Sequence, residues 1–250
     1  IDQSATLAGH EESRAYMNVL EASFNEKSEN SLSKNIAGFW GSWHELSNST
    51  ISTAGRTDVY ERGVQLSRQV NDLNDDLSNI EFDLTREIHA ATEQINSISE
   101  SIATLNQEIR GLEFNSPAND QRDARNFLVT KLAELLDVKS FEQDSGEIVV
   151  YTAGGYQLVN GDDSFKLSSA GQNIMWEGSD GNVADITDKI KSGNIGGWLK
   201  MRDEVVAKYK TELNLMTKEM VWQVNKQHSQ GVGLQFLPKA VTGTYSTDTD

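Results

Sequence analysis

The sequence contains few side chains at spacings that could perform chemistry. Its four histidines are far apart, at His10, His44, His89 and His228. The pair His44-Glu45 is not followed by a second histidine at the spacing that a zinc protease helix requires. His89 lies on the polar face of a predicted helix, as a solvated residue would. The histidines therefore predict no metal site.

The acidic, serine and glycine residues also lack catalytic or ligand-binding patterns. The acidic stretches Asn71–Asp76 and Gly161–Asp163 lack the alternating ligands, central glycine and terminal glutamate of a calcium loop. No serine stands in a nucleophile elbow, and no carboxylate pair marks a glycosidase. The glycine-rich loops between Gly146 and Gly197 lack the Lys-Ser/Thr pair of a phosphate-binding loop. We predict no catalytic residue, no metal and no cofactor.

Composition excludes several classes of partner and site. The chain has 38 acidic and 22 basic residues, which gives a formal net charge of −16, and it has no cysteine. This charge repels phosphate backbones and anionic lipids, so we expect neither nucleic acid nor a membrane as a partner. No apolar run is long enough to span a bilayer, and no signal peptide opens the sequence. The chain begins at Ile1 and ends in a polar run, which we interpret as a core fragment of a longer protein.

The stretch from Thr57 to Leu112 must organise any fold of this chain. Its apolar residues repeat at steps of four and three, which predicts one long helix, roughly 80 Å in length, with a single packing seam. Two consecutive steps of four around Leu84 form a stutter, which locally relaxes a left-handed supercoil. A lone helix would leave this seam in water, so it must pack on other helices. The seam residues are Leu66, Val70, Leu73, Leu77, Ile80, Leu84, Ile88, Ile95, Ile98, Ile102, Leu105 and Ile109.

Shorter helices are predicted on both sides of the long one. Residues 8–24 and 31–46 form two of them, and the second carries the aromatic residues Phe39, Trp40 and Trp43. We interpret these aromatics as packing residues, with a sugar- or peptide-stacking platform as the alternative. A further helix begins near Asn119-Asp120, which are residues that favour a helix cap. The charged residues in its first turns indicate local ion pairs rather than catalysis.

A change of periodicity separates residues 139–193 from the helices. Glu147–Thr152 and Tyr156–Val159, with turns at Gly154-Gly155 and Asn160-Gly161, predict a small antiparallel β unit, to which Phe165–Leu167 and Asn173–Glu177 add strands. We therefore divide the chain into a helical rod over 1–138, a β-rich excursion over 139–193, a returning helix over 194–232 and a linker to a missing outer domain over 233–250. The fold class is mainly α, an elongated coiled-coil-like bundle of long helices with a small antiparallel β subdomain.

The order of these segments, together with several short motifs, resembles the FlgK family of flagellar hook-associated proteins. The motifs are Glu29–Ser33 before Phe39 and Trp43, Ile102–Ile109 before Asn119-Asp120, Val149–Gly155 with Gln157–Val159, and Gly196–Leu199 with Arg202-Asp203 and Asn225–Gly231. After Asp120, Asp123 and Arg125 match the family pattern, whereas Gln121, Arg122 and Asn126 depart from it. The family-matching site residues are Phe39, Trp43, Asn119, Asp120, Asp123, Arg125, Arg202, Asp203, Asn225 and His228.

The resemblance implies a structural role at the junction between hook and filament of the bacterial flagellum. The partners it implies are sister subunits in a ring, the hook protein and the neighbouring junction protein FlgL. It also implies an extracellular location after export through the flagellar type III pathway. We expect the isolated chain to be monomeric and to lack the terminal tube-forming segments of this family.

Other functions stay open at this point. Within the same class, flagellin or an FlgL-type protein would share a long-helix core. From other classes, a cell-wall hydrolase should show a cleft carboxylate with a raised pKa, and a coiled-coil adhesin should form stable oligomers. The residues themselves favour a structural protein over an enzyme.

Overall fold

The computed structural model describes residues 2–24, 30–112 and 117–230. By its contacts the chain divides into two compact units. Unit 1 consists of Ile1–Asn18 and Ile80–Val205, and unit 2 consists of Val19–Asn79 and Val206–Asp250. The last two residues of the predicted returning helix and the predicted linker over 233–250 lie outside the described residues.

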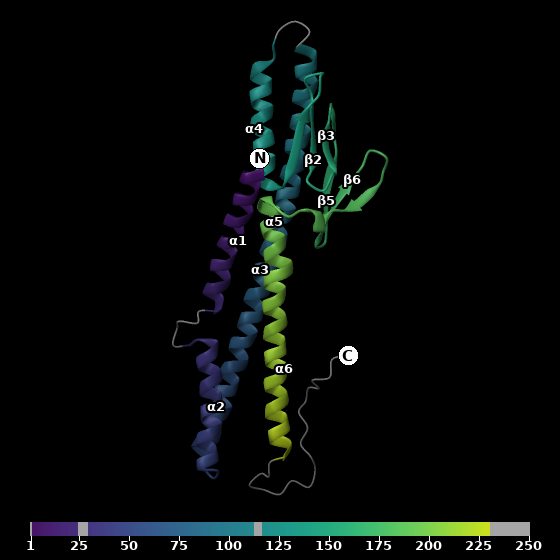
Figure 1. Ribbon diagram of the computed structural model, residues 1–250. Coiled ribbons are helices and arrows are strands. Elements are labelled where there is room, and N and C mark those ends of the chain that lie inside the picture. The colour runs from purple at the N-terminus through teal and green to yellow at the C-terminus, as the bar shows by residue number, and fades with distance from the viewer. Residues whose placement is uncertain (1, 25–29, 113–116, 231–250) are drawn as a thin grey trace. The chain divides into compact units, whose positions relative to one another are not determined.

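The structure confirms a mainly helical chain with small antiparallel sheets (Figure 1). The helices are α1 (Asp2–Phe24), α2 (Leu32–Asn48), α3 (Thr53–Leu112), α4 (Asn119–Leu135), α5 (Gly193–Lys200) and α6 (Ala207–Gln230). One turn of 3-10 helix covers Thr187–Lys189, and a π-helix covers Met201–Val206 between α5 and α6. The returning helix is thus divided into three pieces, which its periodicity did not indicate.

The start of α3 lies four residues before the predicted one. Ser52 accepts a hydrogen bond from the Gly55 N–H at 3.0 Å, which is the geometry of a helix cap. In the same way Ser31 caps α2, because its side chain accepts from the Lys34 N–H. The predicted start of α4 near Asn119 is confirmed, but the predicted cap is wrong, because Ala118 occupies the cap position and makes no side-chain cap bond. Asn119 and Asp120 are instead the first two residues of that helix.

The β segment of unit 1 forms two sheets. The first has the strand order β1 (Val138–Glu142), β2 (Ile148–Thr152), β3 (Gln157–Asn160) and β4 (Asp163–Ser164), and the second has the order β5 (Lys166–Ala170), β6 (Asn173–Glu177) and β7 (Val183–Asp185). All pairings are antiparallel. The turns need glycine at positive φ, as at Gly146 with φ 82° and Gly171 with φ 63°. Strands β1, β4 and β7 were not predicted, because their residues are mostly exposed and lack an apolar alternation.

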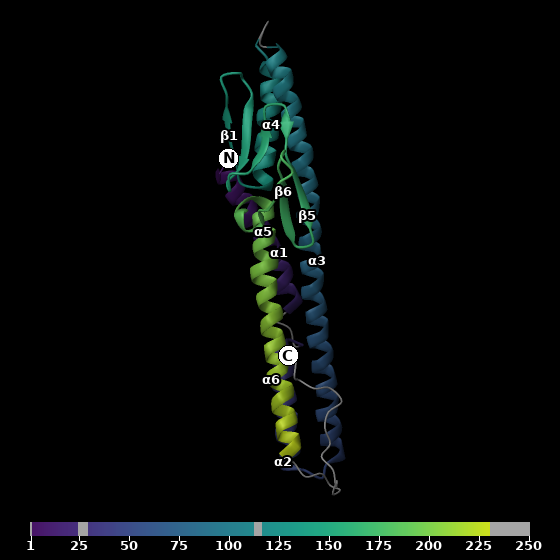
Figure 2. The ribbon, with the colours of Figure 1, turned by 90° about the vertical axis from the view of Figure 1, so that its right-hand side faces the viewer.

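The core of unit 1 lies where α4 and the sheets cover the second part of α3 (Figures 1 and 2). Ile95, Ile102 and Ile109 of α3 are completely buried, as are Leu132 of α4 and Leu158 of β3. These positions bury large aliphatic side chains, each worth about 1.5–3 kcal/mol. Burial of this face, rather than helix propensity, holds the polar-rich α3 in place.

Within unit 1, α1 approaches α5 through glycine. A Cβ atom added to Gly197 would lie 2.4 Å from the carbonyl oxygen of Gly9, and one added to Gly9 would lie 2.7 Å from that of Gly193. The contact is completed by the indole Nε1 of Trp198, which donates to Glu12 Oε2 at 2.9 Å. Only glycine allows the two backbones to come so close.

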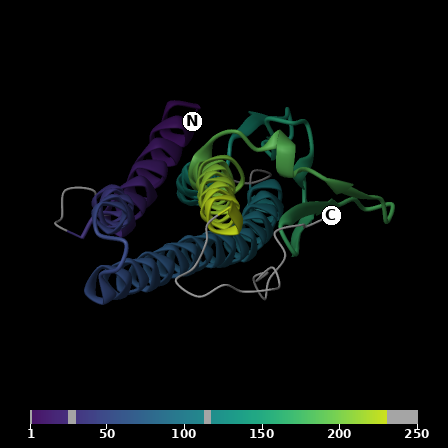
Figure 3. The ribbon, with the colours of Figure 1, turned by 90° about the horizontal axis from the view of Figure 1, so that it is seen from below.

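Unit 2 is built from α2, the first part of α3 and α6. In Figure 3, α2 and α6 are seen nearly end-on, with the start of α3 running past them. Phe39 of α2, Leu66 and Leu73 of α3, and Leu213 of α6 are buried. The ring of Phe24 lies 5.1 Å from that of Tyr209, centroid to centroid.

Candidate functional site

Asn106 lies on the buried face of α3, between Ile102 and Ile109, and has no exposed surface. Its Nδ2 donates to the carbonyls of Ile148 at 2.9 Å and Gly161 at 2.7 Å. Its Oδ1 accepts from the Ile148 N–H at 3.0 Å. The amide therefore offers the donor and acceptor that a neighbouring strand would offer, and it fixes the first sheet to α3.

Arg125 of α4 joins this arrangement from the other side. Its side chain is almost completely buried, and its Nη1 donates to Asn106 Oδ1 at 3.1 Å and to the carbonyl of Gly146 at 2.7 Å. Its Nη2 lies 3.4 Å from Glu142 Oε2, and Arg122 binds the other oxygen of the same carboxylate. Pairing of both Nη groups offsets much of the cost of burying this charge. Arg125 thus ties α4, α3 and the β1–β2 hairpin together.

Arg110 continues the network at the surface. Its guanidinium lies 2.8 Å from Glu147 Oε1 and 3.1 Å from Asp162 Oδ2. A hydrogen bond from its own backbone N–H, and then the hydrogen bond and charge of Arg110, lower the pKa of Asp162. The hydrogen bond to Asp162, followed by the charge of Glu147, raises the pKa of Arg110. The exposed pair of Arg110 and Asp162, together with the buried Glu147, holds the turn after β3 close to α3.

Asn96 repeats the Asn106 contact with the second sheet. Its Nδ2 donates to the carbonyl of Leu167 at 2.8 Å, and its Oδ1 accepts from the N–H of the same residue at 2.8 Å. The two asparagines are ten residues apart on α3, and each satisfies backbone groups of one sheet. We conclude that two side-chain amides of α3 supply hydrogen bonds to strand backbone that a neighbouring strand would otherwise supply.

The family-matching pair Arg202-Asp203 lies in the π-helix. Arg202 is buried, and its Nε and Nη2 donate to the two oxygens of Asp203 at 2.7 and 3.0 Å. Nη2 also donates to the carbonyl of Gln172 at 2.7 Å, in the turn between β5 and β6. The pair therefore connects the π-helix to the second sheet, which is a positioning role within unit 1.

The other family-matching residues do not converge on one place. Asn119, Asp120 and Asp123 are exposed on α4, and Asn225 and His228 are exposed near the end of α6. In unit 2, Phe39 is buried and meets the half-buried Trp43 edge to face at 6.4 Å. Of the twelve seam residues of α3, Val70 and Leu105 are half-buried and the other ten are buried.

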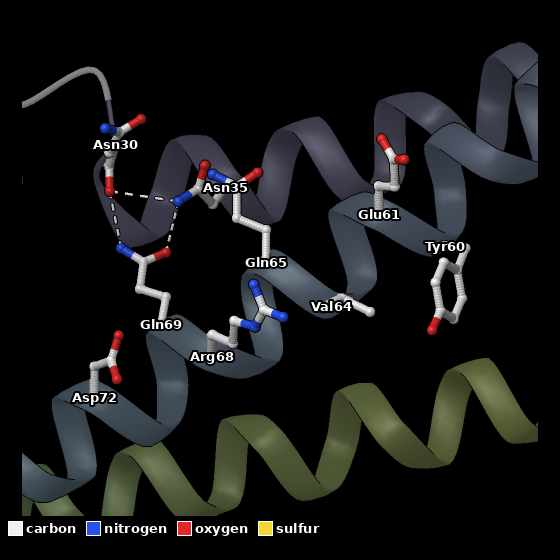
Figure 4. A pocket seen from close by; sticks show the side chains of 9 residues that line it. All are labelled: Asn30, Asn35, Tyr60, Glu61, Val64, Gln65, Arg68, Gln69 and Asp72. Atoms are coloured by element: carbon white, nitrogen blue, oxygen red, sulfur yellow. Dashed lines mark hydrogen bonds between the residues drawn. The ribbon is translucent and has the colours of Figure 1, made fainter.

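An open groove runs along α3 in unit 2. It consists of two adjoining cavities of about 580 and 430 Å³, which share Tyr60, Val64 and Arg68. Most of the residues that line the larger cavity are polar, and Figure 4 shows the amides of Asn35, Gln65 and Gln69 among them. There Gln69 donates to the carbonyl of Asn30 at 2.8 Å and accepts from Asn35 at 2.7 Å. The smaller cavity is apolar and is lined by Phe39, Trp43, Val59, Tyr60, Gly63, Val64, Ser67, Arg68 and Val224.

Chemically, these arrangements suit packing and docking. The four histidines are not brought together, and among residues 2–24, 30–112 and 117–230 no group of three or more His, Asp or Glu side chains could hold a metal ion. In the same part of the chain, no helix combines the length and apolar character needed to cross a bilayer. What the geometry does provide is a set of buried hydrogen-bonded joints and one open groove.

Sequence reasoning missed Asn96 and Asn106. The sequence contains one weak indication that Asn106 is buried. It lies four residues after Ile102 and three before Ile109, so it falls on the seam at a position where an apolar residue is expected. The pattern instead favoured Leu105, which is only half-buried. A polar residue on the apolar face of a helix indicates a buried partner, but the sequence does not show which backbone supplies it.

Comparisons with known proteins identify what this chain is similar to. The family model described as "Flagellar hook-associated protein FlgK helical domain" matches residues 17–239. Flagellar hook-associated protein 1 of Bacillus subtilis is 27% identical over 150 residues, which cover 59% of this chain and 30% of that protein. The protein of the same name in Escherichia coli is 24% identical over 239 residues, which cover 91% of this chain and 43% of that protein.

A solved structure supports the same fold. The flagellar hook junction protein FlgK from Burkholderia pseudomallei superposes with a TM-score of 0.82 at 20% sequence identity. The match covers 93% of this chain and 44% of that chain. The present chain therefore spans less than half the length of the relatives that it matches.

Proposed function

Because this chain belongs to the family of the FlgK helical domain, we propose that it forms part of a structural adaptor that joins hook to filament in the bacterial flagellum. The match of the family model over residues 17–239 is the observation that carries this proposal. It is supported by the fold, which is that of a hook junction protein.

The geometry of unit 1 suits a mechanical adaptor. Asn96, Asn106, Arg125 and Arg202 connect α3, α4, the π-helix and both sheets through buried hydrogen bonds. Such joints resist sliding of one element past another, because each displacement would leave a buried polar group without a partner. In our proposal, residues 1–138 and 194–232 carry the mechanical load, residues 139–193 form the β excursion, and residues 233–250 lead to an outer domain.

The proposed partners are sister subunits in a ring, the hook protein and FlgL. The net charge of −16 keeps unassembled subunits apart until assembly brings them together. The protein reaches its extracellular site through the flagellar type III pathway in this proposal. The chain acts by binding and not by catalysis, which a peptidoglycan zymogram of the purified chain tests; cleared bands would contradict the proposal.

Immunogold electron microscopy of isolated flagella tests the location. Antibody raised to this chain should label the point where hook meets filament. A strain that lacks the gene controls for cross-reaction with other flagellar proteins. Label along the whole filament would instead indicate flagellin, and absence of label from the organelle would exclude a flagellar role.

A further inference from the structure

The larger cavity of unit 2 is lined by polar side chains that have no partner within the protein. Four of them share one face of α3, because they follow one another at steps of four, three and four residues: Glu61, Gln65, Arg68 and Asp72. None of the four makes a hydrogen bond or an ion pair with any residue that the structure describes. Their donors and acceptors are therefore available to a ligand.

Arg68 and Asp72 show that this face of α3 is not closed by ion pairs of its own. Opposite charges four residues apart on a helix commonly pair, as Asp58 and Arg62 do at 2.9 Å earlier in α3. Figure 4 shows the guanidinium of Arg68 turned away from Asp72. The cavity thus presents a cationic donor and carboxylate acceptors that do not neutralise one another.

Other groups of the same cavity are held in fixed positions. The side chain of Asn35 donates to Gln69 Oε1 at 2.7 Å, and both side chains donate to the carbonyl of Asn30. A ligand that meets groups already held by hydrogen bonds loses less conformational entropy on binding. At one end of the cavity the ring of Tyr60 is 71% exposed, so one of its faces is open to a flat apolar group.

We propose that this cavity binds a neutral oligosaccharide that carries acetamido groups. Each sugar hydroxyl both donates and accepts hydrogen bonds, so it can serve a guanidinium, a carboxylate and an amide alike. The ring of Tyr60 supplies an apolar face for a sugar ring. An acetamido group joins an amide to a methyl, which suits the border where Gln65 lies next to Val64 and the apolar cavity begins. The volume of about 580 Å³ is typical of sites for small ligands.

Other classes of ligand leave part of the cavity unsatisfied. An anion would meet Glu61 and Asp72 against one cation, Arg68, on a chain of net charge −16. An apolar ligand would take these charged groups out of water without giving them partners. A second copy of the chain brings the same net charge of −16 and is repelled. Sugar binding goes beyond the flagellar role proposed above, and neither depends on the other.

Isothermal titration calorimetry of the full chain tests the ligand class. Tri-N-acetylchitotriose should bind with saturable, one-to-one heat. Cellotriose, which has the same linkage and hydroxyls in place of the acetamido groups, should bind at least about fivefold more weakly, and the anionic trigalacturonate should not bind. Absence of chitotriose binding, equal affinity for cellotriose, or binding of trigalacturonate would each overturn the proposal.

Paired variants test the site. Tyr60→Ala should weaken chitotriose binding by about tenfold, because the stacking face is lost. The matched control is Phe82→Ala, which removes a ring of α3 that is 68% exposed and does not line the cavity. Asp72→Asn should also weaken binding, whereas Asp75→Asn, which removes an exposed charge one turn farther along, should not. Equal affinities within either pair would overturn the proposal.

Nuclear magnetic resonance locates the contact without mutation. On addition of chitotriose, the backbone amide shifts of residues 60–72 should change together and saturate at the affinity that calorimetry gives. Changes confined to other residues would overturn the proposal. If the same amides shift with protein concentration alone, the groove is an interface between copies, which would also overturn it.

Discussion

Asn106 and Asn96 make the same kind of contact at different depths. Both amides satisfy strand backbone from α3, but Asn106 is completely buried and also binds Arg125, whereas Asn96 is partly exposed and binds one residue. Removing the deeper amide leaves backbone groups of Ile148 and Gly161 without these partners and takes away one of the acceptors of the buried Arg125 guanidinium. The difference in unfolding free energy between alanine variants at the two positions therefore measures how burial changes the contribution of such an amide.

We expect Asn106→Ala to lower the free energy of unfolding by about 3–5 kcal/mol, because it leaves several buried backbone groups unpaired and removes one acceptor of the buried Arg125 guanidinium. Asn96→Ala should cost about 1–2 kcal/mol, since water reaches the exposed groups. Urea unfolding followed by circular dichroism measures both values. Equal losses would contradict the assignment of Asn106 as the main joint of unit 1.

Asp185 makes part of the stability of unit 1 depend on pH. Hydrogen bonds from the hydroxyl and backbone N–H of Thr187, and then from Asn173, lower the pKa of the Asp185 carboxyl. A lowered pKa adds stability that is present above the unfolded pKa of about 3.9 and is lost as pH falls through the folded value. The carboxylate thus stabilises the fold at neutral pH and not in acid.

Asp185→Asn should accordingly lower the melting temperature at pH 7. The difference in melting temperature between the variant and the unmodified chain, called the gap below, should narrow as the pH falls below about 4. Thermal melts at a series of pH values give this gap. Asp188→Asn, which removes one exposed charge from the same segment, is the matched control. A gap that stays constant with pH would show that the carboxylate is not the stabilising form.

The seam of α3 acts at the scale of the element. Ile98 is 9% exposed, whereas Glu100 is exposed two positions farther along the same helix. We expect Ile98→Ala to cost about 2–5 kcal/mol, because it leaves a cavity among packed side chains. Glu100→Ala should change the stability by a few tenths of a kcal/mol at most. If urea unfolding showed equal, small losses of stability in the two variants, the proposed packing role of the seam would be wrong.

The crossing of α1 and α5 depends on Gly197. Gly197→Ala would place a methyl group 2.4 Å from the carbonyl oxygen of Gly9. Because that oxygen belongs to the backbone, a side-chain rotation cannot relieve the clash. We expect a loss of about 1–3 kcal/mol and faster amide exchange along residues 3–18. Gly41→Ala in α2 meets nothing within 4 Å, so it should stabilise its helix by about 0.5–1 kcal/mol. If Gly197→Ala left the stability and the amide exchange unchanged, the two helices would not be in contact in solution.

Charge acts at the scale of the whole molecule. With a net charge of −16 and a sequence pI near 4.6, we expect the chain to be monomeric at neutral pH and low salt. Static light scattering should give a positive second virial coefficient that falls as salt screens the repulsion, and association should appear as the pH approaches 4.6. A stable oligomer at neutral pH would favour the adhesin alternative.

Much of this protein could be predicted from periodicity alone. The apolar steps of α3 placed the long helix to within four residues at its start, and the period of two placed β2, β3 and β6. These features depend on local patterning, which the sequence displays directly. The order of motifs, from Phe39 to Arg202, also indicated the family that the comparisons establish.

Only the tertiary structure decided which residues hold these elements together. Asn106 and Arg125 are 19 positions apart, Asn96 and Leu167 are 71 apart, and Gly9 and Gly197 meet only when α1 crosses α5. An asparagine on a helix looks the same in sequence whether it faces water or a strand edge. Its role follows from the backbone that folding places opposite it, and long-range contacts of this kind leave no periodic trace in the chain.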